Sequence, residues 1–69
     1  MASHLLTPRE KQIFEMLVKN KTTYDIANKL QISEKTVRNH ISNVICKLGV
    51  SSRTQAILEL IKYHIIRLE

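Results

Sequence analysis

The chain has 69 residues, which limits it to one small domain, and 43 % of them are hydrophobic, as in a folded domain rather than a disordered tail. Its net charge of +5 fits an acidic partner such as nucleic acid, and it fits ordinary surface solubility equally well. The single cysteine excludes an internal disulfide and a cysteine-cluster metal site, and no apolar run reaches the roughly 18 residues of a membrane span. Without a signal peptide in the sequence, we expect a cytoplasmic protein with no membrane partner.

Capping boxes predict the first two helices. In a capping box, a Ser or Thr and an acidic or amide residue three positions later bind each other's backbone N–H groups. Thr7 and Glu10 form one such box, and Pro8 between them suits the first position of a helix. Thr22 and Asp25 form a second box. Apolar residues at helical spacing follow both boxes. The predicted helices cover residues 8–19 and 23–30.

The second half of the chain predicts two further helices. Ser33 can cap a helix, and Gly49 is placed to end it in the left-handed conformation. Ser52 with Gln55 forms a third capping box. No segment alternates between apolar and polar residues as a strand would, so we expect an all-α fold of four helices in a single domain over residues 1–69. The last two helices are predicted over residues 34–48 and 53–64.

The helix predicted over residues 34–48 has one apolar and one polar face. Placed at about 100° per residue, its apolar side chains fall within one sector that would face the core. This sector contains Val37, Ile41, Val44, Ile45 and Leu48. The opposite side contains Lys35, Asn39, Ser42, Asn43 and Cys46, with Arg38 at one border and Thr36, His40 and Lys47 at the other.

The polar face of this helix is rich in amide and hydroxyl groups. An ordinary solvated face favours paired Glu and Lys, and Asn lowers helix propensity because its amide competes with the backbone. Arg38, Asn39, Ser42 and Asn43 are residue types that bind base edges in DNA. Taken alone, the two asparagines fit tolerated surface residues equally well. The helices at 23–30 and 34–48, joined by a short turn, have the spacing of a helix-turn-helix, although Gln31 stands where glycine is frequent.

Four segments together resemble the LuxR-type helix-turn-helix domain, also called the NarL or GerE type. They are "LTPRE" (6–10), "IANKLQISEKTV" (26–37), His40 and "KLGVSSRTQA" (47–56). The resemblance extends from about Leu5 to Ile65, and "KTT" (21–23) with "SEKTVRNHISN" (33–43) is most similar to short stand-alone members. Asn20 stands where many members have Gly, and Asp25 where many have Glu.

The resemblance implies a transcription regulator that places its third helix in the major groove of double-stranded DNA and forms a homodimer through its fourth helix. With the polar face, it implies base contacts by Arg38, Asn39 and Ser42. Asn43 on the same face is also predicted to contact a base, with a phosphate or only water as the alternatives. The phosphate contacts that it implies are made by Thr23, Lys35, Thr36, His40, Lys47 and Arg53. Arg53 has an alternative structural role, either anchoring its loop to the third helix or pairing with Glu10.

The fourth helix has more apolar residues than one core face requires, which favours a symmetric dimer on two DNA half-sites. Alternatively, Leu58 and Ile65 extend the core over the first helix. The predicted dimer contacts are Leu58, Ile61, Lys62 and Ile65.

Other functions have weaker support in the sequence. The three histidines lack metal-ligand spacing, and we find no phosphate loop and no nucleophile with a base, so we expect no metal, cofactor, small-molecule ligand or enzyme activity. The second interpretation is a module like region 4 of a sigma factor, whose main partner would be RNA polymerase. Cys46 is expected to be an ordinary exposed thiol, with redox sensing as the less favoured role.

Overall fold

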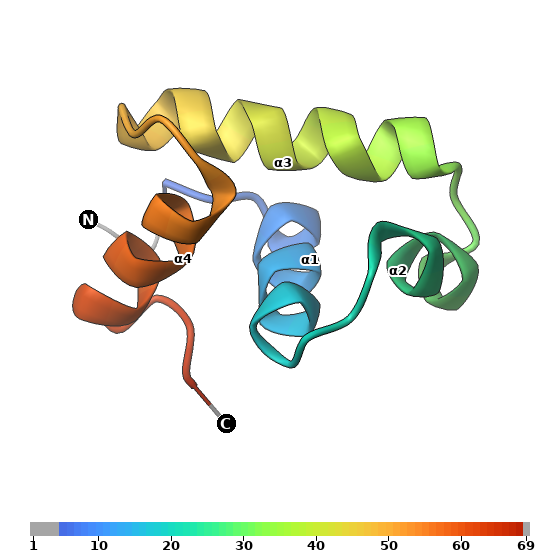
Figure 1. The fold of residues 1–69 in the computed structure, drawn as a ribbon, viewed down its shortest axis with the longest axis horizontal. Helices are drawn as coiled ribbons and strands as arrows, with labels where there is room; N and C mark the ends of the chain where they lie inside the picture. Colours follow the sequence, from blue (N-terminus) through green and yellow to red (C-terminus); the bar gives the residue numbers. More distant parts are fainter. Residues whose placement is uncertain (1–4, 69) are drawn as a thin grey trace.

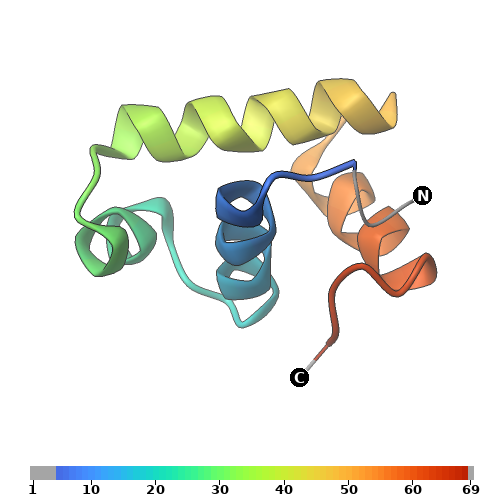
Figure 2. The same cartoon turned by 180° about the vertical axis from the view of Figure 1, so that it is seen from behind.

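The computed structural model describes residues 5–68, and within them the chain forms four helices and no strand. They are α1 (Pro8–Val18), α2 (Thr23–Leu30), α3 (Glu34–Leu48) and α4 (Arg53–Lys62). The longest helix, α3, runs across one side of the molecule, and the other three lie beneath it (Figure 1). The view from behind shows the same arrangement, with α1 between α2 and α4 (Figure 2).

All four helices begin at the predicted residues, because the predicted N-cap residue accepts a backbone N–H at each start. Thr7 with Glu10 and Thr22 with Asp25 make complete capping boxes. Ser33 accepts the N–H of Thr36. The capping box predicted for Ser52 and Gln55 at the start of α4 is only half formed, so that prediction was wrong in part. Ser52 accepts the N–H of Gln55, but the Gln55 side chain turns to Ser51 and accepts its N–H at 2.9 Å.

Each helix ends in the same way, with one residue in the left-handed conformation and the next donating its N–H to the carbonyl five positions back. These bonds join Lys21 to Met16, Ile32 to Ala27, Val50 to Ile45 and Ile65 to Leu60. Gly49 occupies the left-handed position after α3 as predicted, with φ +69°. The other three left-handed residues are Asn20, Gln31 and His64, with φ of +68°, +57° and +61°. Consequently α4 ends at Lys62, two residues before the predicted end, and α1 ends at Val18, one residue before.

Replacing Gln31 by glycine is expected to stabilise the domain by about 0.5–1 kcal/mol. A residue with a Cβ in the left-handed conformation costs about 1–2 kcal/mol, so glycine relieves this strain in the folded state. Glycine also gives the unfolded chain more conformational freedom, which offsets part of the stabilisation. Asn20→Gly is the matched control, since asparagine tolerates this conformation, and it should gain clearly less. Urea unfolding of both variants measures the difference; equal gains would contradict this account of Gln31.

The hydrophobic core lies between α3 and the three helices beneath it, because α1, α2 and α4 each pack against α3. The core side of α3 contributes Val37, Ile41 and Val44, all buried as the helical wheel predicts, with Ile45 and Leu48 partly buried beside them. The largest fully buried side chains are Phe14, Ile13, Ile26, Leu60, Val37 and Val44. This packing fixes the orientation of the opposite face of α3.

Candidate nucleic-acid interface

The outer face of α3 is fully available to a partner. The helix forms one edge of the molecule, and the other three helices pack against its opposite side (Figure 1). The residues on this face are all exposed: Lys35, Arg38, Asn39, Ser42, Asn43 and Cys46. Three or four turns of helix therefore present two amides, a hydroxyl and two cations to the solvent.

The turn between α2 and α3 is held by local contacts. Gln31 reverses the chain, and Ser33 caps α3 with its hydroxyl 3.0 Å from the N–H of Thr36. The hydroxyl of Thr23, the first residue of α2, donates to Glu34, the first residue of α3, at 3.2 Å. This bond ties the start of α2 to the start of α3, and two helices joined by a turn of three residues are the arrangement of a helix-turn-helix.

Glu10 is the only charged side chain among the described residues that is buried, at 3 % exposure, and it links α1 to α3. Its carboxylate accepts the N–H of Thr7 at 2.9 Å and the ammonium of Lys47 at 2.6 Å. Lys47 also donates to the carbonyl of Leu5 at 3.2 Å. Burial raises the pKa of Glu10, but the bonds from Lys47 and Thr7 and the nearby charges of Lys47 and His40 together hold it below its ordinary value of 4.5.

The pairing of Glu10 with Lys47 corrects the alternative role expected for Arg53. Arg53 is exposed at the start of α4, and within residues 5–68 it makes no ion pair or side-chain hydrogen bond. Lys47, expected at a phosphate, already has two protein partners, although 34 % of its side chain remains exposed. Sequence reasoning missed this pair, because the two residues are 37 positions apart.

The remaining candidate phosphate contacts lie along one border of the exposed face. Thr36 and His40 are half-buried on α3, and Thr23 is half-buried at the start of α2. The hydroxyl of Thr36 is 2.9 Å from that of Ser33, and the hydroxyl of Thr23 is bonded to Glu34. Thr23 thus lies near the start of α3, where Lys35 and Thr36 also lie, whereas Lys47 and Arg53 lie at the other end of α3.

Comparison with known proteins assigns this chain to a family. The sequence model of the family described as "Bacterial regulatory proteins, luxR family" matches residues 4–60, which is most of the chain. The chain belongs to the LuxR family. This is a family of regulators, and the sequence therefore identifies a regulatory protein with a helix-turn-helix domain.

Individual relatives agree with the LuxR-family assignment. The chain is 62 % identical over 58 residues to the spore germination protein GerE of Bacillus subtilis, covering 84 % of this chain and 78 % of that protein. A solved structure titled "Structure of Transcription factor, GerE" superposes with a TM-score of 0.92 at 60 % identity, covering 94 % of this chain and 97 % of that one. The chain is also 44 % identical over 59 residues to the transcriptional regulatory protein DegU of Brevibacillus brevis, covering 86 % of this chain and a quarter of that protein.

Two further observations concern membrane-spanning helices and metal-binding groups in this LuxR-family protein. Across residues 5–68, no helix is both long and apolar enough to cross a membrane. In the same range, no group of His, Cys, Asp and Glu side chains is arranged to bind a metal ion.

Proposed function

We propose that the protein is a transcription regulator that binds specific sequences of double-stranded DNA by placing the outer face of α3 in the major groove. The observation that carries the proposal is the amide-rich face of α3, which is exposed throughout while the opposite face is locked into the core. The width of the major groove accepts one α-helix, and Arg and Asn side chains can each form two hydrogen bonds with a purine edge. The family membership supports a regulatory role for this contact.

Two groups of side chains would make different contacts with DNA, one with bases and one with phosphates. Four exposed residues of the outer face would contact bases, namely Arg38, Asn39, Ser42 and Asn43. Residues at its border and at the helix starts would contact phosphates, namely Thr23, Lys35, Thr36, His40, Lys47 and Arg53. Within the second group, Lys35 and Arg53 carry charges that make no ion pair in the described part of the chain, so they would supply most of the attraction.

Asn39→Ala is expected to weaken binding to the preferred duplex by about 1–3 kcal/mol. The variant should also discriminate less between the four bases at the one base pair that Asn39 contacts. Lys35→Ala should weaken binding to all duplexes by a similar factor, because a phosphate contact carries no sequence information. Both side chains are exposed, so the fold should be unaffected. Selection of bound duplexes from a random pool, followed by titration of single-base variants, measures both effects.

The two variants serve as controls for each other. If Asn39→Ala and Lys35→Ala changed the sequence preference in the same way, the division into base and phosphate contacts would be wrong. Binding to isolated duplex DNA also separates the regulator from a module that binds DNA only inside a polymerase complex. Absence of any affinity for isolated duplexes would contradict the proposed function.

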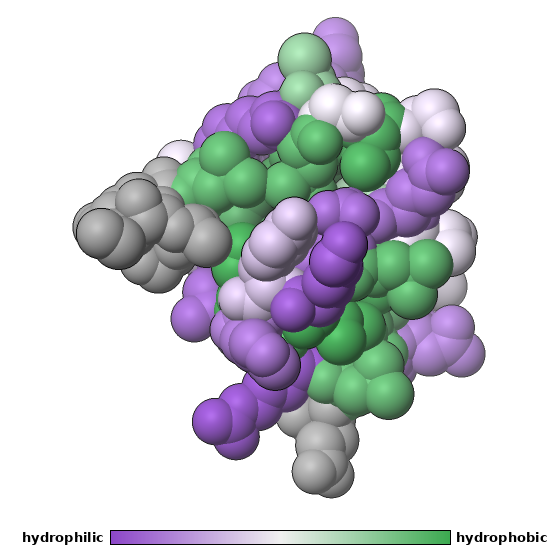
Figure 3. Space-filling model, turned by 90° about the vertical axis from the view of Figure 1, so that its left-hand side faces the viewer, coloured by the Kyte–Doolittle hydropathy of each residue, from purple (hydrophilic) through white to green (hydrophobic). Residues whose placement is uncertain are grey.

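We further propose that α4 joins two copies of the chain, so that two α3 helices reach two half-sites. Leu58 is 61 % exposed in the middle of α4, and Ile61 on the same helix and Ile65 after its end are only partly buried. Figure 3 looks onto the end of the molecule where α4 lies, and hydrophobic atoms cover much of this surface. An exposed apolar surface of this kind on a small protein favours a partner, and a second copy of the chain would cover it symmetrically. The proposed contacts are Leu58, Ile61, Lys62 and Ile65.

Leu58→Glu is expected to raise the dissociation constant of the dimer at least about tenfold, because two carboxylates would meet across the symmetric contact. Tyr24→Glu is the matched control, since Tyr24 is equally exposed, at 63 %, but lies on α2. Sedimentation over a concentration series measures the monomer–dimer equilibrium of both variants. An unchanged equilibrium in Leu58→Glu would show that α4 is not the dimer contact.

A further inference from the structure

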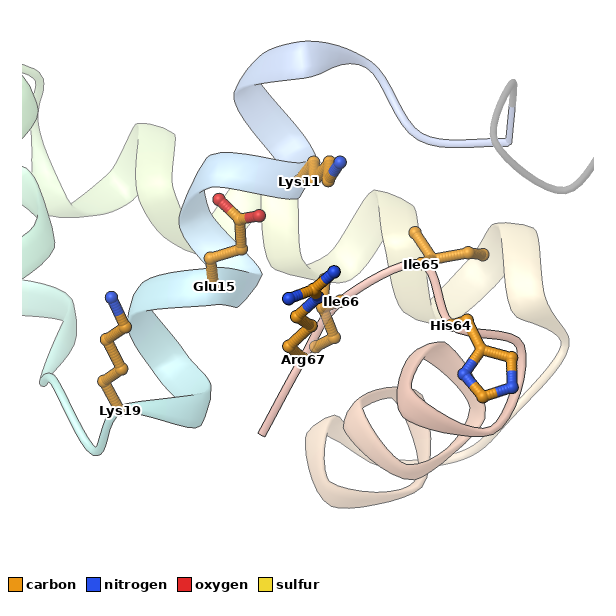
Figure 4. Close-up of a pocket in the computed structure, with 7 residues that line it drawn as sticks. All are labelled: Lys11, Glu15, Lys19, His64, Ile65, Ile66 and Arg67. Atoms are coloured by element: carbon orange, nitrogen blue, oxygen red, sulfur yellow. The ribbon is translucent and has the colours of Figure 1, made fainter. Parts of the chain in front are cut away.

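A basic hollow lies beside α1, between this helix and the C-terminal segment that follows α4. Its volume is about 390 Å³. Lys11, Lys19 and Arg67 line it together with Glu15, and the partly buried Ile65 adds an apolar wall. Figure 4 shows Lys11, Glu15 and Lys19 along one side of α1, with Arg67 and Ile65 opposite them on the C-terminal segment. The hollow is therefore open, polar and mainly cationic.

A second hollow, of about 680 Å³, continues this surface between α1 and α2. It shares Glu15 and Lys19 with the first and adds Lys21 and Lys29, with Met16 as an apolar contact. Its other carboxylate, Asp25, already accepts the N–H of Thr22 as the cap of α2. We call the two hollows together the α1 surface.

The α1 surface has an excess of uncompensated positive charge. Five cations line it (Lys11, Lys19, Lys21, Lys29 and Arg67) against two carboxylates, an excess of three, while the whole chain has +5. In the described part of the chain, none of the five makes an ion pair or a side-chain hydrogen bond. A duplex bound to the outer face of α3 does not account for the charge of the first hollow, because α3 passes behind α1 when that hollow faces the viewer (Figure 4).

We infer that the α1 surface binds an acidic segment of a second protein while α3 holds DNA. Carboxylates of the segment would meet the five cations, and its apolar side chains would contact Met16. A second DNA duplex fits less well, because Glu15 stands in the wall shared by both hollows and opposes a continuous row of phosphates. The inference does not depend on the proposed base contacts, since the two surfaces have no residue in common.

The test uses a fluorescein-labelled peptide of Glu-Glu-Leu repeats, whose anisotropy reports binding to the full chain with and without saturating duplex DNA. We expect Lys19→Glu and, separately, Arg67→Glu to weaken peptide binding at least about tenfold. Arg9→Glu is the matched control, because Arg9 is exposed on the same helix, undergoes the same change of charge and lines neither hollow. It should change peptide affinity less than about twofold.

Each result has a defined meaning, provided that circular dichroism shows the variants to be folded. Loss of peptide binding in Lys19→Glu and Arg67→Glu with retained duplex binding supports the inference. An equal loss in Arg9→Glu would show that only net charge matters and would overturn it. Competition between peptide and duplex, or a loss of duplex affinity in Lys19→Glu as large as in Lys35→Glu, would overturn it in favour of a nucleic-acid surface. Failure of duplex binding alone would count only against the proposed function.

Discussion

Replacing Glu10 by alanine is expected to lower the free energy of unfolding by about 3 kcal/mol, a large part of the stability of so small a domain. The substitution removes the acceptor of the Thr7 N–H and the partner of Lys47 at once. Because Lys47 is 34 % exposed, it can partly turn to water, and the loss should fall at the lower end of the range for a broken buried pair. Urea unfolding followed by circular dichroism measures the change.

Glu15→Ala is the matched control for this substitution. Glu15 lies on the same helix, is exposed and makes no ion pair in the described part of the chain, so its loss should change stability by less than about 0.5 kcal/mol. A Lys47→Met variant and the double variant complete a cycle that isolates the pair from the cap. If Glu10→Ala were no more destabilising than Glu15→Ala, the buried pair would not stabilise the fold.

The lowered pKa of Glu10 also predicts how stability depends on pH. A carboxyl whose pKa is lower in the folded state than in the unfolded state stabilises the fold above the unfolded value, and the contribution is lost as the pH falls through the folded value. The unfolded value is the ordinary 4.5, so the loss begins near that pH and continues below it. Asp25, whose pKa is lowered by its hydrogen bonds with Thr22, acts in the same direction. The stability difference between wild type and Glu10→Gln should therefore shrink as the pH is lowered from neutral, as urea midpoints would show.

Affinity for the specific duplex is expected to fall about 100-fold when salt rises from about 50 to about 200 mM. The estimate assumes a dimer in which Lys35 and Arg53 of each copy neutralise one phosphate apiece, so that about four counterions are released. Over that salt range the loss corresponds to about 3 kcal/mol of binding free energy. Fluorescence anisotropy of a labelled duplex at several salt concentrations gives the slope directly.

Lys35→Ala should reduce that slope by the share of one phosphate contact per copy, whereas Ser42→Ala should leave it unchanged because a hydroxyl releases no counterion. An affinity that did not respond to salt would exclude the proposed phosphate contacts altogether.

The starts of the helices could be predicted because a cap is a local event. Thr7, Thr22, Ser33 and Ser52 each accept a backbone N–H three residues later, so a short window of sequence contains all the information. The division of α3 into a core face and an exposed face followed equally from spacing alone. The all-α fold and the helix-turn-helix within it are therefore confirmed as predicted.

The helix ends and the buried ion pair could not be predicted because they depend on distant parts of the chain. His64 adopts the left-handed conformation although its sequence fits a longer helix, and the turn lets Ile66 reach the core at 2 % exposure. Glu10 and Lys47 are 37 positions apart, so neither helical spacing nor local charge pattern indicates their contact. The partner of the Gln55 side chain was also predicted wrongly, although it is local, because Ser51 and Ser52 both lie within its reach and it binds Ser51.

The packing of all other helices against α3 ties folding to recognition. The helix that would enter the groove is also the element that α1, α2 and α4 share, so it cannot loosen without exposing the core. Partial opening that frees α3 is therefore disfavoured, and its slowest-exchanging amide protons should exchange only when the whole domain unfolds. In a cell, a substitution that weakens the core would reduce the number of binding-competent molecules without altering the sequence that they recognise.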